Sequence, residues 1–321
     1  MLSPPYWLKL LVKRSSTSYH SGDIMTTHSV KKLIEIFGFS PEDHTSEARK
    51  FWDLKACPFI GRACTKFDHT NTICYGTCSV SNGGSNVVIC PNRLYENDYA
   101  TIRNVSTDVF GAKIPMIFFD EYVKIFGDTK EVIVALGQYS GKEVKLSQMS
   151  MDWVLAHIRS GELQEYVGIE VQSIDITGNY RDVWYAAKNQ ENVLPASAHG
   201  LNWANVHKRL IPQLIRKGLI YSRSALVRKG LYFVVPETVF RKFEEIIGND
   251  IPKVNHAEKD VVSVFTYNLS QKPQHGQKRS VVLDRVLRFK MDEFAARFIS
   301  GANLPPGRVL DDKIREVLTV K

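Results

Sequence analysis

Residues 167–175 read Val-Gly-Ile-Glu-Val-Gln-Ser-Ile-Asp, a run in which apolar and polar side chains alternate. A period of two is typical of a β-strand, because successive side chains of a strand point to opposite faces of the sheet. The alternation places Glu170 and Gln172 on one face and Ile169 and Val171 on the other. The segment therefore predicts a strand with one apolar face and one face that carries two polar side chains.

A further carboxylate lies a short distance upstream. Asp152 belongs to the apolar run 151–156, which predicts another strand, and Gly161 provides a turn between the two strands. If the strands are neighbours, Asp152 meets Glu170, and the two form an oxygen-rich site suited to Mg²⁺. Such a site supports phosphodiester hydrolysis, since a metal lowers the pKa of the attacking water. A half-exposed strand with a polar outer face gives the same pattern.

The rest of the chain predicts a mixture of helices and strands, which from about residue 130 onward indicates an α/β or α+β domain. Amphipathic periodicity predicts helices at residues 29–37, 202–217 and 238–247. Apolar or alternating runs predict strands at residues 131–136, 143–146, 151–156, 166–176, 231–235, 261–267 and 281–289.

All five cysteines lie between positions 57 and 90. Clustering of this kind is typical of metal ligands or cross-links. The apolar run at residues 10–12 is too short for a signal peptide, and no stretch reaches the ~18 apolar residues of a membrane span. We therefore expect a cytosolic protein with no membrane segment, in which thiols stay reduced, and we favour a metal over disulfides. Several subsets of four cysteines are possible ligands. Because the block shows little periodicity, we expect the metal to serve as its core.

The charge distribution favours a polyanionic partner. The chain has 42 Lys and Arg against 34 Asp and Glu, for a net charge of +8. Residues 201–230 contain seven basic side chains and no acidic one, and a second basic stretch covers residues 272–290. Such stretches suit phosphate groups, although an ordinary solvated face also has this composition.

Several short motifs follow one another along the chain. They are Cys-Pro-Phe at 57–59, Cys-x-Lys at 64–66, Gly-x-Cys-x-Val at 76–80, Val-x-Cys-Pro-Asn-Arg at 88–93, Asp-Trp at 152–153, Glu-x-Gln-x-x-Asp at 170–175 and the basic segment 202–209. In type and order these motifs resemble those of the NotI-type restriction endonucleases, and the resemblance covers roughly residues 50–265.

The resemblance implies a PD-(D/E)xK nuclease core, a mixed sheet flanked by helices, in which Gln172 replaces the usual lysine. By similarity, Asp152 and Glu170 hold Mg²⁺, and Gln172 orients the water through hydrogen bonds, since an amide carries no charge. Glu143 is a candidate fourth member of the site or a surface residue beside a turn.

The resemblance also implies a small subdomain with a four-cysteine metal site that binds iron or zinc. It assigns Cys57, Cys64, Cys78 and Cys90 as ligands and leaves Cys74 free, because Cys78 lies in the Gly-x-Cys-x-Val context. We expect residues 25–98 to form an N-terminal helix and this subdomain, and residues 99–321 to form the nuclease domain. Residues 1–24 are expected to be an extension ahead of an alternative start at Met25.

The implied function is that of a homodimeric type II restriction endonuclease that cuts both strands of a palindromic double-stranded DNA site. The two-fold symmetry of such a site is the reason to expect a dimer. A DNA methyltransferase is the expected functional counterpart in a bacterial cytoplasm. The alternatives are a sequence-specific DNA-binding protein without cleavage and a DNA repair nuclease.

Overall fold

The computed structural model describes residues 31–126, 130–146, 149–301 and 304–319. The expectations about residues 1–24, about Met25 and about the first part of the 29–37 helix concern residues outside these ranges in whole or in part. None of the helices in the described ranges has the length and apolar character that crossing a lipid bilayer requires.

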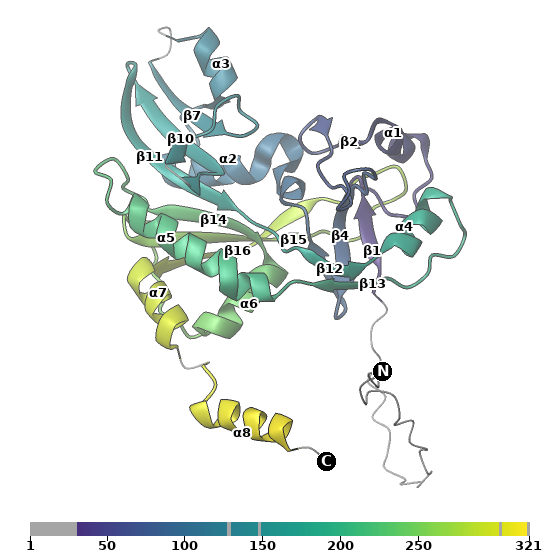
Figure 1. The fold of residues 1–321 in the computed structure, drawn as a ribbon. Coiled ribbons are helices and arrows are strands. Elements are labelled where there is room, and N and C mark those ends of the chain that lie inside the picture. The colour runs from purple at the N-terminus through teal and green to yellow at the C-terminus, as the bar shows by residue number, and fades with distance from the viewer. Residues whose placement is uncertain (1–30, 127–129, 147–148, 302–303, 320–321) are drawn as a thin grey trace, which may run out of the picture.

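A mixed seven-stranded sheet forms the centre of the molecule, in the order β16-β15-β14-β11-β10-β7-β6 (Figure 1). β10 pairs antiparallel with β7 and β11, β14 pairs parallel with β11 and β15, β16 is antiparallel to β15, and β6 is parallel to β7. The strands are β6 (Met116–Phe118), β7 (Glu131–Gly137), β10 (Trp153–Arg159), β11 (Glu162–Val171), β14 (Leu231–Pro236), β15 (Val261–Leu269) and β16 (Val281–Lys290).

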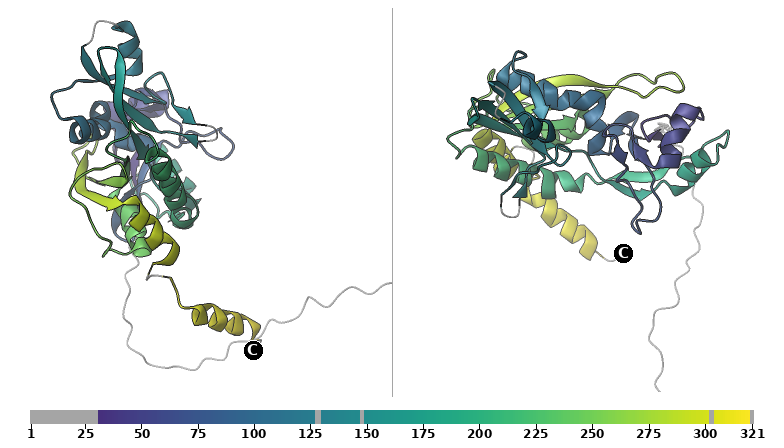
Figure 2. Two further views of the ribbon diagram at one scale, coloured as in Figure 1. Left: turned by 90° about the vertical axis from the view of Figure 1, so that its left-hand side faces the viewer. Right: turned by 90° about the horizontal axis from the view of Figure 1, so that it is seen from above.

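Helices cover both faces of this sheet, and the fold is therefore α/β with a mixed sheet between helical layers (Figure 2). α2 (Glu96–Phe110) packs on one face, against Ile169 and Val171 of β11 among others. The opposite face packs against α5 (Ile211–Tyr221), α6 (Glu237–Ile247) and α7 (Met291–Ser300). The predicted alternation of residues 167–172 thus directs its apolar side chains to α2 and its polar side chains to the α5 side.

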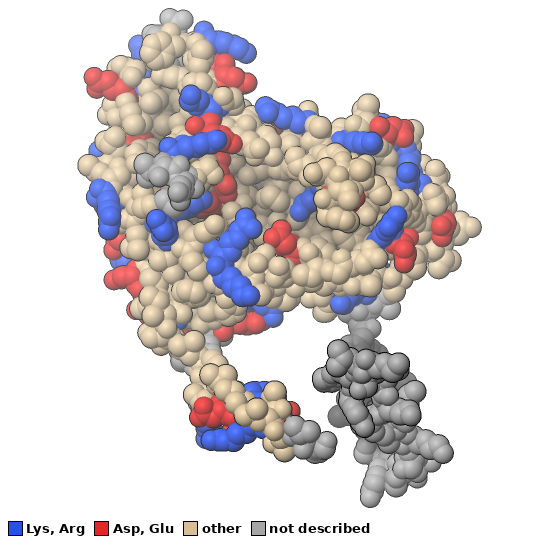
Figure 3. Space-filling view, viewed as in Figure 1, with Lys and Arg blue, Asp and Glu red and all other residues tan. Residues whose placement is uncertain are grey.

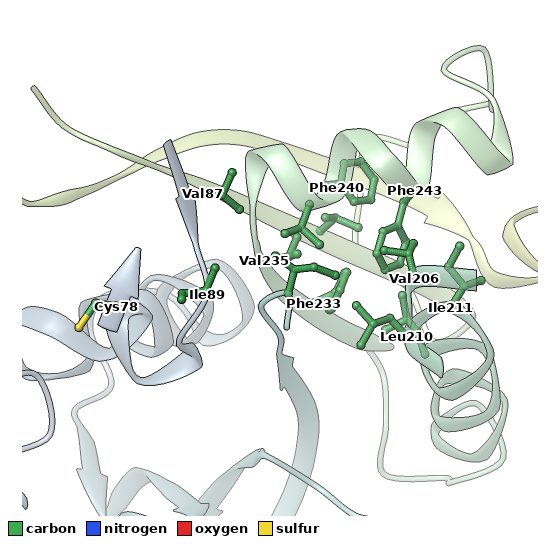
Figure 4. Close-up of a cluster of buried hydrophobic side chains, with 14 of the residues drawn as sticks. Cys78, Val87, Ile89, Val206, Leu210, Ile211, Phe233, Val235, Phe240 and Phe243 are labelled. Atoms are coloured by element: carbon green, nitrogen blue, oxygen red, sulfur yellow. The ribbon is translucent and has the colours of Figure 1, made fainter. Parts of the chain in front are cut away.

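A second, smaller sheet lies beside the first and has the order β1-β4-β5. It consists of β1 (Leu33–Ile36), β4 (Thr77–Asn82) and β5 (Ser85–Val88). Around it lie α1 (Ser46–Leu54), β2 (Ala56–Cys57), β3 (Arg62–Ala63), α4 (Arg181–Lys188), β12 (Ile176–Asn179) and β13 (Ala198–Leu201). One apolar cluster runs from this sheet to the α6 side of the central sheet, and Figure 4 shows Val87 and Ile89 between Cys78 and the phenylalanines Phe233 and Phe240.

The cysteine block packs against apolar side chains of other segments. Its thiols share a buried cluster with Leu33, Ile36 and Phe37, and with Val80 and Val87 of its own hairpin. The expectation that a metal alone provides the core of this segment is therefore wrong. Sequence periodicity failed here because the apolar partners come from other parts of the chain.

Two local predictions are also wrong. In place of a helix at residues 29–37, the described part of that segment contains strand β1, which pairs antiparallel with β4 and ends at a turn where Gly38 has φ +83°. The predicted strand 143–146 is reduced to β8 (Lys145–Leu146), which pairs with β9 (Met149–Ser150), while β10 takes the place beside β7. Both segments are short, and for short segments tertiary pairing outweighs local periodicity.

Most other predicted elements are present with shifted ends. β11 ends at Val171, and residues 176–179 form the separate strand β12. The predicted helix 202–217 begins as a π-helical turn, η2 (Val206–Leu210), and continues as α5, whose first turn contains Pro212. The remaining elements are the 3₁₀ turn η1 (Pro91–Tyr95), α3 (Phe119–Lys124) and α8 (Gly307–Leu318), and α8 lies apart from the body in Figures 1 and 2.

A buried arginine connects the two sheets. Arg93 is fully buried, its Nη2 lies 3.1 Å from Glu35 Oε1 on β1, and its Nη1 pairs with Glu96 at the start of α2. Its guanidinium also donates to the backbone carbonyl of Arg279, in the loop that precedes β16. Several segments far apart in the sequence therefore meet at one buried side chain.

We predict that Arg93→Ala lowers the free energy of unfolding by about 3–5 kcal/mol, because it leaves two buried carboxylates without their counter-charge. The matched control is Arg315→Ala, which removes an exposed ion pair with Asp312 on α8 and should change stability by less than about 0.5 kcal/mol. Urea denaturation of both variants measures the difference. Equal stability of the two would show that the Arg93 network does not hold the sheets together.

Candidate active site and cysteine cluster

The hairpin of β10 and β11 brings the two predicted carboxylates together. The hairpin turns at Gly161, which has φ +79°, and Trp153 pairs with Ile169, so that Asp152 lies across from Glu170. Asp152 Oδ2 accepts a 2.9 Å hydrogen bond from the backbone amide of Val171 and a 3.4 Å bond from Gln172 Nε2. Three of the four predicted site residues thus converge at the end of this hairpin opposite its turn.

Glu170 is 4% exposed, and its two carboxylate oxygens have different surroundings. Its Oε2 accepts a hydrogen bond from Lys217 Nζ of α5. Its Oε1 is buried and has no hydrogen-bond partner among the described residues. A buried carboxylate oxygen without a partner is costly, and such an atom calls for an explanation such as an ion or a water.

Lys217 was missed by the sequence analysis, although the sequence contains a signal for it. The buried residues of α5 include Leu214, Lys217, Gly218 and Tyr221, which recur at helical spacing on one face. Lys217 is the only charged member of this otherwise apolar or aromatic face. A single lysine at such a position indicates a buried counter-charge on the element against which the helix packs.

Two glycines allow α5 to approach the site. A Cβ at Gly168 of β11 would overlap the ring of Tyr221, and a Cβ at Gly218 would overlap Met291 of α7. Gly168 and Glu170 lie two residues apart on one strand face, while Tyr221 and Lys217 lie one turn apart on α5. Contact between Gly168 and Tyr221 therefore also sets Lys217 against Glu170.

Burial favours the neutral, protonated forms of the Asp152 and Glu170 carboxyl groups. Burial, reinforced by the like charge of Asp152, raises the pKa of Glu170 to about 8, although Lys217 acts in the opposite direction. Burial also raises the pKa of Asp152, against the hydrogen bond from the Val171 amide. A cation bound between the two carboxylates would reverse both shifts.

This donor set fits a magnesium ion. It offers two adjacent carboxylates, one of which has an oxygen without a partner. Among the described residues, no group of three or more His, Cys, Asp or Glu side chains is arranged to hold a metal ion. Mg²⁺ commonly uses only one or two protein carboxylates and keeps several water ligands, so two carboxylates suffice.

Glu143 lies outside this cluster. It is partly exposed, and in the described part of the chain its side chain pairs with Lys145 at 3.0 Å and makes no hydrogen bond to Asp152 or Glu170. Its neighbour Val144 accepts a backbone hydrogen bond from Met151, so the loop passes beside the approach to Asp152. A role for Glu143 in the site stays a prediction.

All five cysteines are buried and lie in one cluster. Burial, followed by the charges of neighbouring thiols, raises the pKa of Cys57 to about 11 and also raises that of Cys78. Burial raises the pKa of Cys90 as well. A hydrogen bond between Cys64 and Cys74 raises the pKa of Cys64 and lowers that of Cys74. The structure therefore brings Cys74 to Cys64, beside the four predicted ligands.

Four thiols in such a cluster have the right chemistry for a tetrahedral zinc or iron site, and metal binding would offset the cost of ionising buried thiols. The charge of a Cys64 thiolate affects the pKa of both Cys78 and Cys90. Cys74 interacts with two of the predicted ligands, Cys64 and Cys78. As with the carboxylates, the described side chains do not have the arrangement of a formed metal site. The ligand set stays a prediction.

Basic side chains lie on α5, the helix that carries Lys217, and on the segments directly before and after it. Of the seven basic residues between 201 and 230, five are exposed, namely Lys208, Arg209, Arg216, Arg223 and Arg228. Figure 3 shows a hollowed face of the molecule with Lys and Arg side chains spread around it. The segment from 201 to 230 therefore presents positive charge to solvent.

Comparison with known proteins gives one finding. A family model described as "Restriction endonuclease NotI" matches residues 48–281, which is more than half of the chain. The matched range contains Asp152, Glu170, Gln172, Lys217 and the cysteine cluster. A search of curated proteins found no match.

For the cysteine cluster we predict that Cys78→Ser abolishes binding of one equivalent of iron or zinc, while Cys74→Ser retains it. The substitution replaces a buried thiol by a weak oxygen donor, and the metal thereby loses one of its four soft ligands. Elemental analysis of the purified variants measures the metal content. Retention of the metal in Cys78→Ser with loss in Cys74→Ser, or an absence of metal from the unmutated protein, would refute the ligand set.

Proposed function

Because the chain belongs to the NotI restriction endonuclease family, we propose that it is a type II enzyme that uses Mg²⁺ to hydrolyse both strands of a palindromic DNA site. As a restriction endonuclease it acts on DNA. The proposal adds the metal, the symmetry of the site and the residues that perform the reaction.

The observation that carries the proposal is the buried pair of Asp152 and Glu170. The hairpin register holds both carboxylates at the same end of β10 and β11, and Glu170 Oε1 has no partner in the described part of the chain. Two adjacent buried carboxyl groups whose pKa values are raised by burial are typical of a functional site. A PD-(D/E)xK core, with Asp152 and Glu170 as its acidic pair, accounts for this arrangement.

In the proposed reaction, a water molecule forms a bond to phosphorus while the bond from phosphorus to the leaving sugar oxygen breaks. The water releases a proton to solvent and the leaving oxygen takes one up, so the products are a phosphomonoester and a free hydroxyl. Bound Mg²⁺ would supply charge neutralisation at the phosphate and a lowered pKa for the water. Asp152 and Glu170 would hold it, and Gln172 would orient the water through its amide.

The cysteine cluster is proposed to bind one structural iron or zinc ion through Cys57, Cys64, Cys78 and Cys90. Cys78 lies on β4 of the smaller sheet, and the segment from 57 to 90 has short strands and many exposed turn residues. A metal in this segment would stabilise these turns, which are proposed to contact DNA. The apolar cluster that contains the thiols also contains residues of the central sheet. The proposed cysteine subdomain and the nuclease domain therefore share a core.

DNA contact is proposed along the exposed basic side chains of residues 208–228, because that segment contains no acidic residue. Of these side chains, Arg228 lies 3.9 Å from Glu165 of β11. A palindromic site presents two equivalent halves, and a two-fold dimer of this chain would match them. A cognate methyltransferase would protect the host DNA. In such a dimer, the carboxylate pair of each protomer would face one of the two DNA strands.

We predict that Glu170→Gln lowers the rate of DNA cleavage in Mg²⁺ by at least about 10³-fold, because loss of one metal ligand forfeits several kcal/mol of transition-state stabilisation. Specific DNA binding in Ca²⁺ should be retained. The matched control is Glu162→Gln, at the exposed start of the same strand, which should cut at the unmutated rate.

Plasmid digestion followed by sequencing of the product ends measures the outcome. Discrete fragments with one end sequence support restriction at a palindromic site, nicking at junctions or free ends would favour a repair nuclease, and a gel shift without cleavage would favour a DNA-binding protein. Near-normal cleavage by Glu170→Gln would show that the active site lies elsewhere.

A further inference from the structure

A lysine from a helix occupies the place beside the carboxylate pair. Lys217 Nζ binds Glu170 Oε2, and the side chains of the two residues are 11% and 5% exposed. In the described part of the chain Lys217 is the only buried lysine. Its position is therefore unlike that of the other basic residues in the segment from 201 to 230.

Stability alone does not explain this contact. Replacement of a buried ion pair by apolar residues is often neutral or stabilising, because desolvation of the two charges offsets their attraction. Leu214 and Tyr221 flank Lys217 on its own helix face and are buried in the apolar cluster. An apolar side chain at position 217 would extend that face, so the lysine calls for another role.

The strand that carries Glu170 lacks a positive charge of its own. Gln172, two residues beyond Glu170 on the same face, donates to Asp152 Oδ2 but its amide is neutral. A phosphate that enters the site would thus meet two carboxylates, one amide and one ammonium group. The ammonium group of Lys217 is the positive charge that the structure places in contact with the pair.

We propose that Lys217 is a catalytic residue of the cleavage reaction, and that its ammonium group contacts the scissile phosphate and supplies the charge that Gln172 cannot provide. A lysine side chain has a flexible four-carbon stem, so Nζ can exchange Glu170 for a phosphate oxygen in the same site. There it stabilises the negative charge that develops on the phosphoryl oxygens as water attacks. This inference rests on the proposed function and adds a residue to its active site.

The geometry also restricts how Lys217 reaches the site. Gly168 and Gly218 hold α5 between β11 and α7 at a distance that side chains would not permit. Lys217 is thereby held by a rigid helix, which suits a group that must act at a fixed position.

The test compares Lys217→Met with the control Lys242→Met, which removes a lysine–glutamate pair of α6 away from the carboxylates. Lys217→Met should lower kcat by about 10²-fold or more, as expected for loss of one charge-stabilising group. Its Kd for specific DNA in Ca²⁺ should stay close to that of the unmutated protein. Because the buried Glu170 loses its counter-charge, the Tm should fall, and kcat is therefore measured at a temperature well below the Tm of the variant. Lys242→Met should leave kcat unchanged.

The double variant Gln172→Lys/Lys217→Met provides the second readout. A lysine at 172 returns positive charge to the site from the strand, so kcat should recover by at least about tenfold over Lys217→Met. Failure of this rescue, a kcat within about threefold of normal in Lys217→Met, or a loss of activity that parallels a loss of DNA binding would overturn the proposal.

A crystal structure of the unmutated protein with DNA and Ca²⁺ gives a readout independent of activity. Lys217 Nζ should lie within about 3.2 Å of a non-bridging oxygen of the scissile phosphate. An Nζ that remains bound only to Glu170 would refute the inference. If Glu170→Gln loses cleavage while Lys217→Met does not, the inference alone fails; if both cut normally, the proposed function fails with it.

Discussion

The contact between the carboxyl groups of Asp152 and Glu170 is the constraint to which the surrounding structure is adjusted. Two buried acids on adjacent strands repel each other, and burial raises the pKa of both. Asp152 accepts hydrogen bonds from the Val171 amide and the Gln172 side chain, and Glu170 accepts one from Lys217. Among the described residues, Glu170 Oε1 has no hydrogen-bond donor. The neutral acid of Glu170 can share a hydrogen bond with Asp152, whereas the ionised pair would be stabilised by a bound cation.

The smaller sheet depends on the central sheet through a different set of contacts. Arg93 holds Glu35 and Glu96 in a buried network, and the thiols lie in an apolar cluster that continues to Phe233 and Phe240. A metal bound by the cysteines would therefore stiffen a segment that already packs against the nuclease sheet. In the proposed function, the cysteine cluster would thereby support the geometry of the active site.

Much of the site could be predicted because local rules operate there. The alternation of residues 167–172 and the turn at Gly161 fix which side chains share a face, and the hairpin register follows. Helical spacing marks Lys217 as a buried cation, but its pairing with Glu170 could not be predicted, because that contact depends on how closely α5 packs on Gly168. The predicted helix at residues 29–37 is wrong for a similar reason, because the pairing of β1 with β4 is a contact between distant segments.

The central claim is that Asp152 and Glu170 together bind the catalytic metal. Its most direct test is a crystal of the protein with Mn²⁺ in place of Mg²⁺ and with DNA, examined by anomalous scattering. An anomalous peak is expected between the two carboxylates, at about 2–2.3 Å from an oxygen of each and beside a backbone phosphate. A well-ordered DNA complex without a peak at this position, or with the peak at other residues, would contradict it.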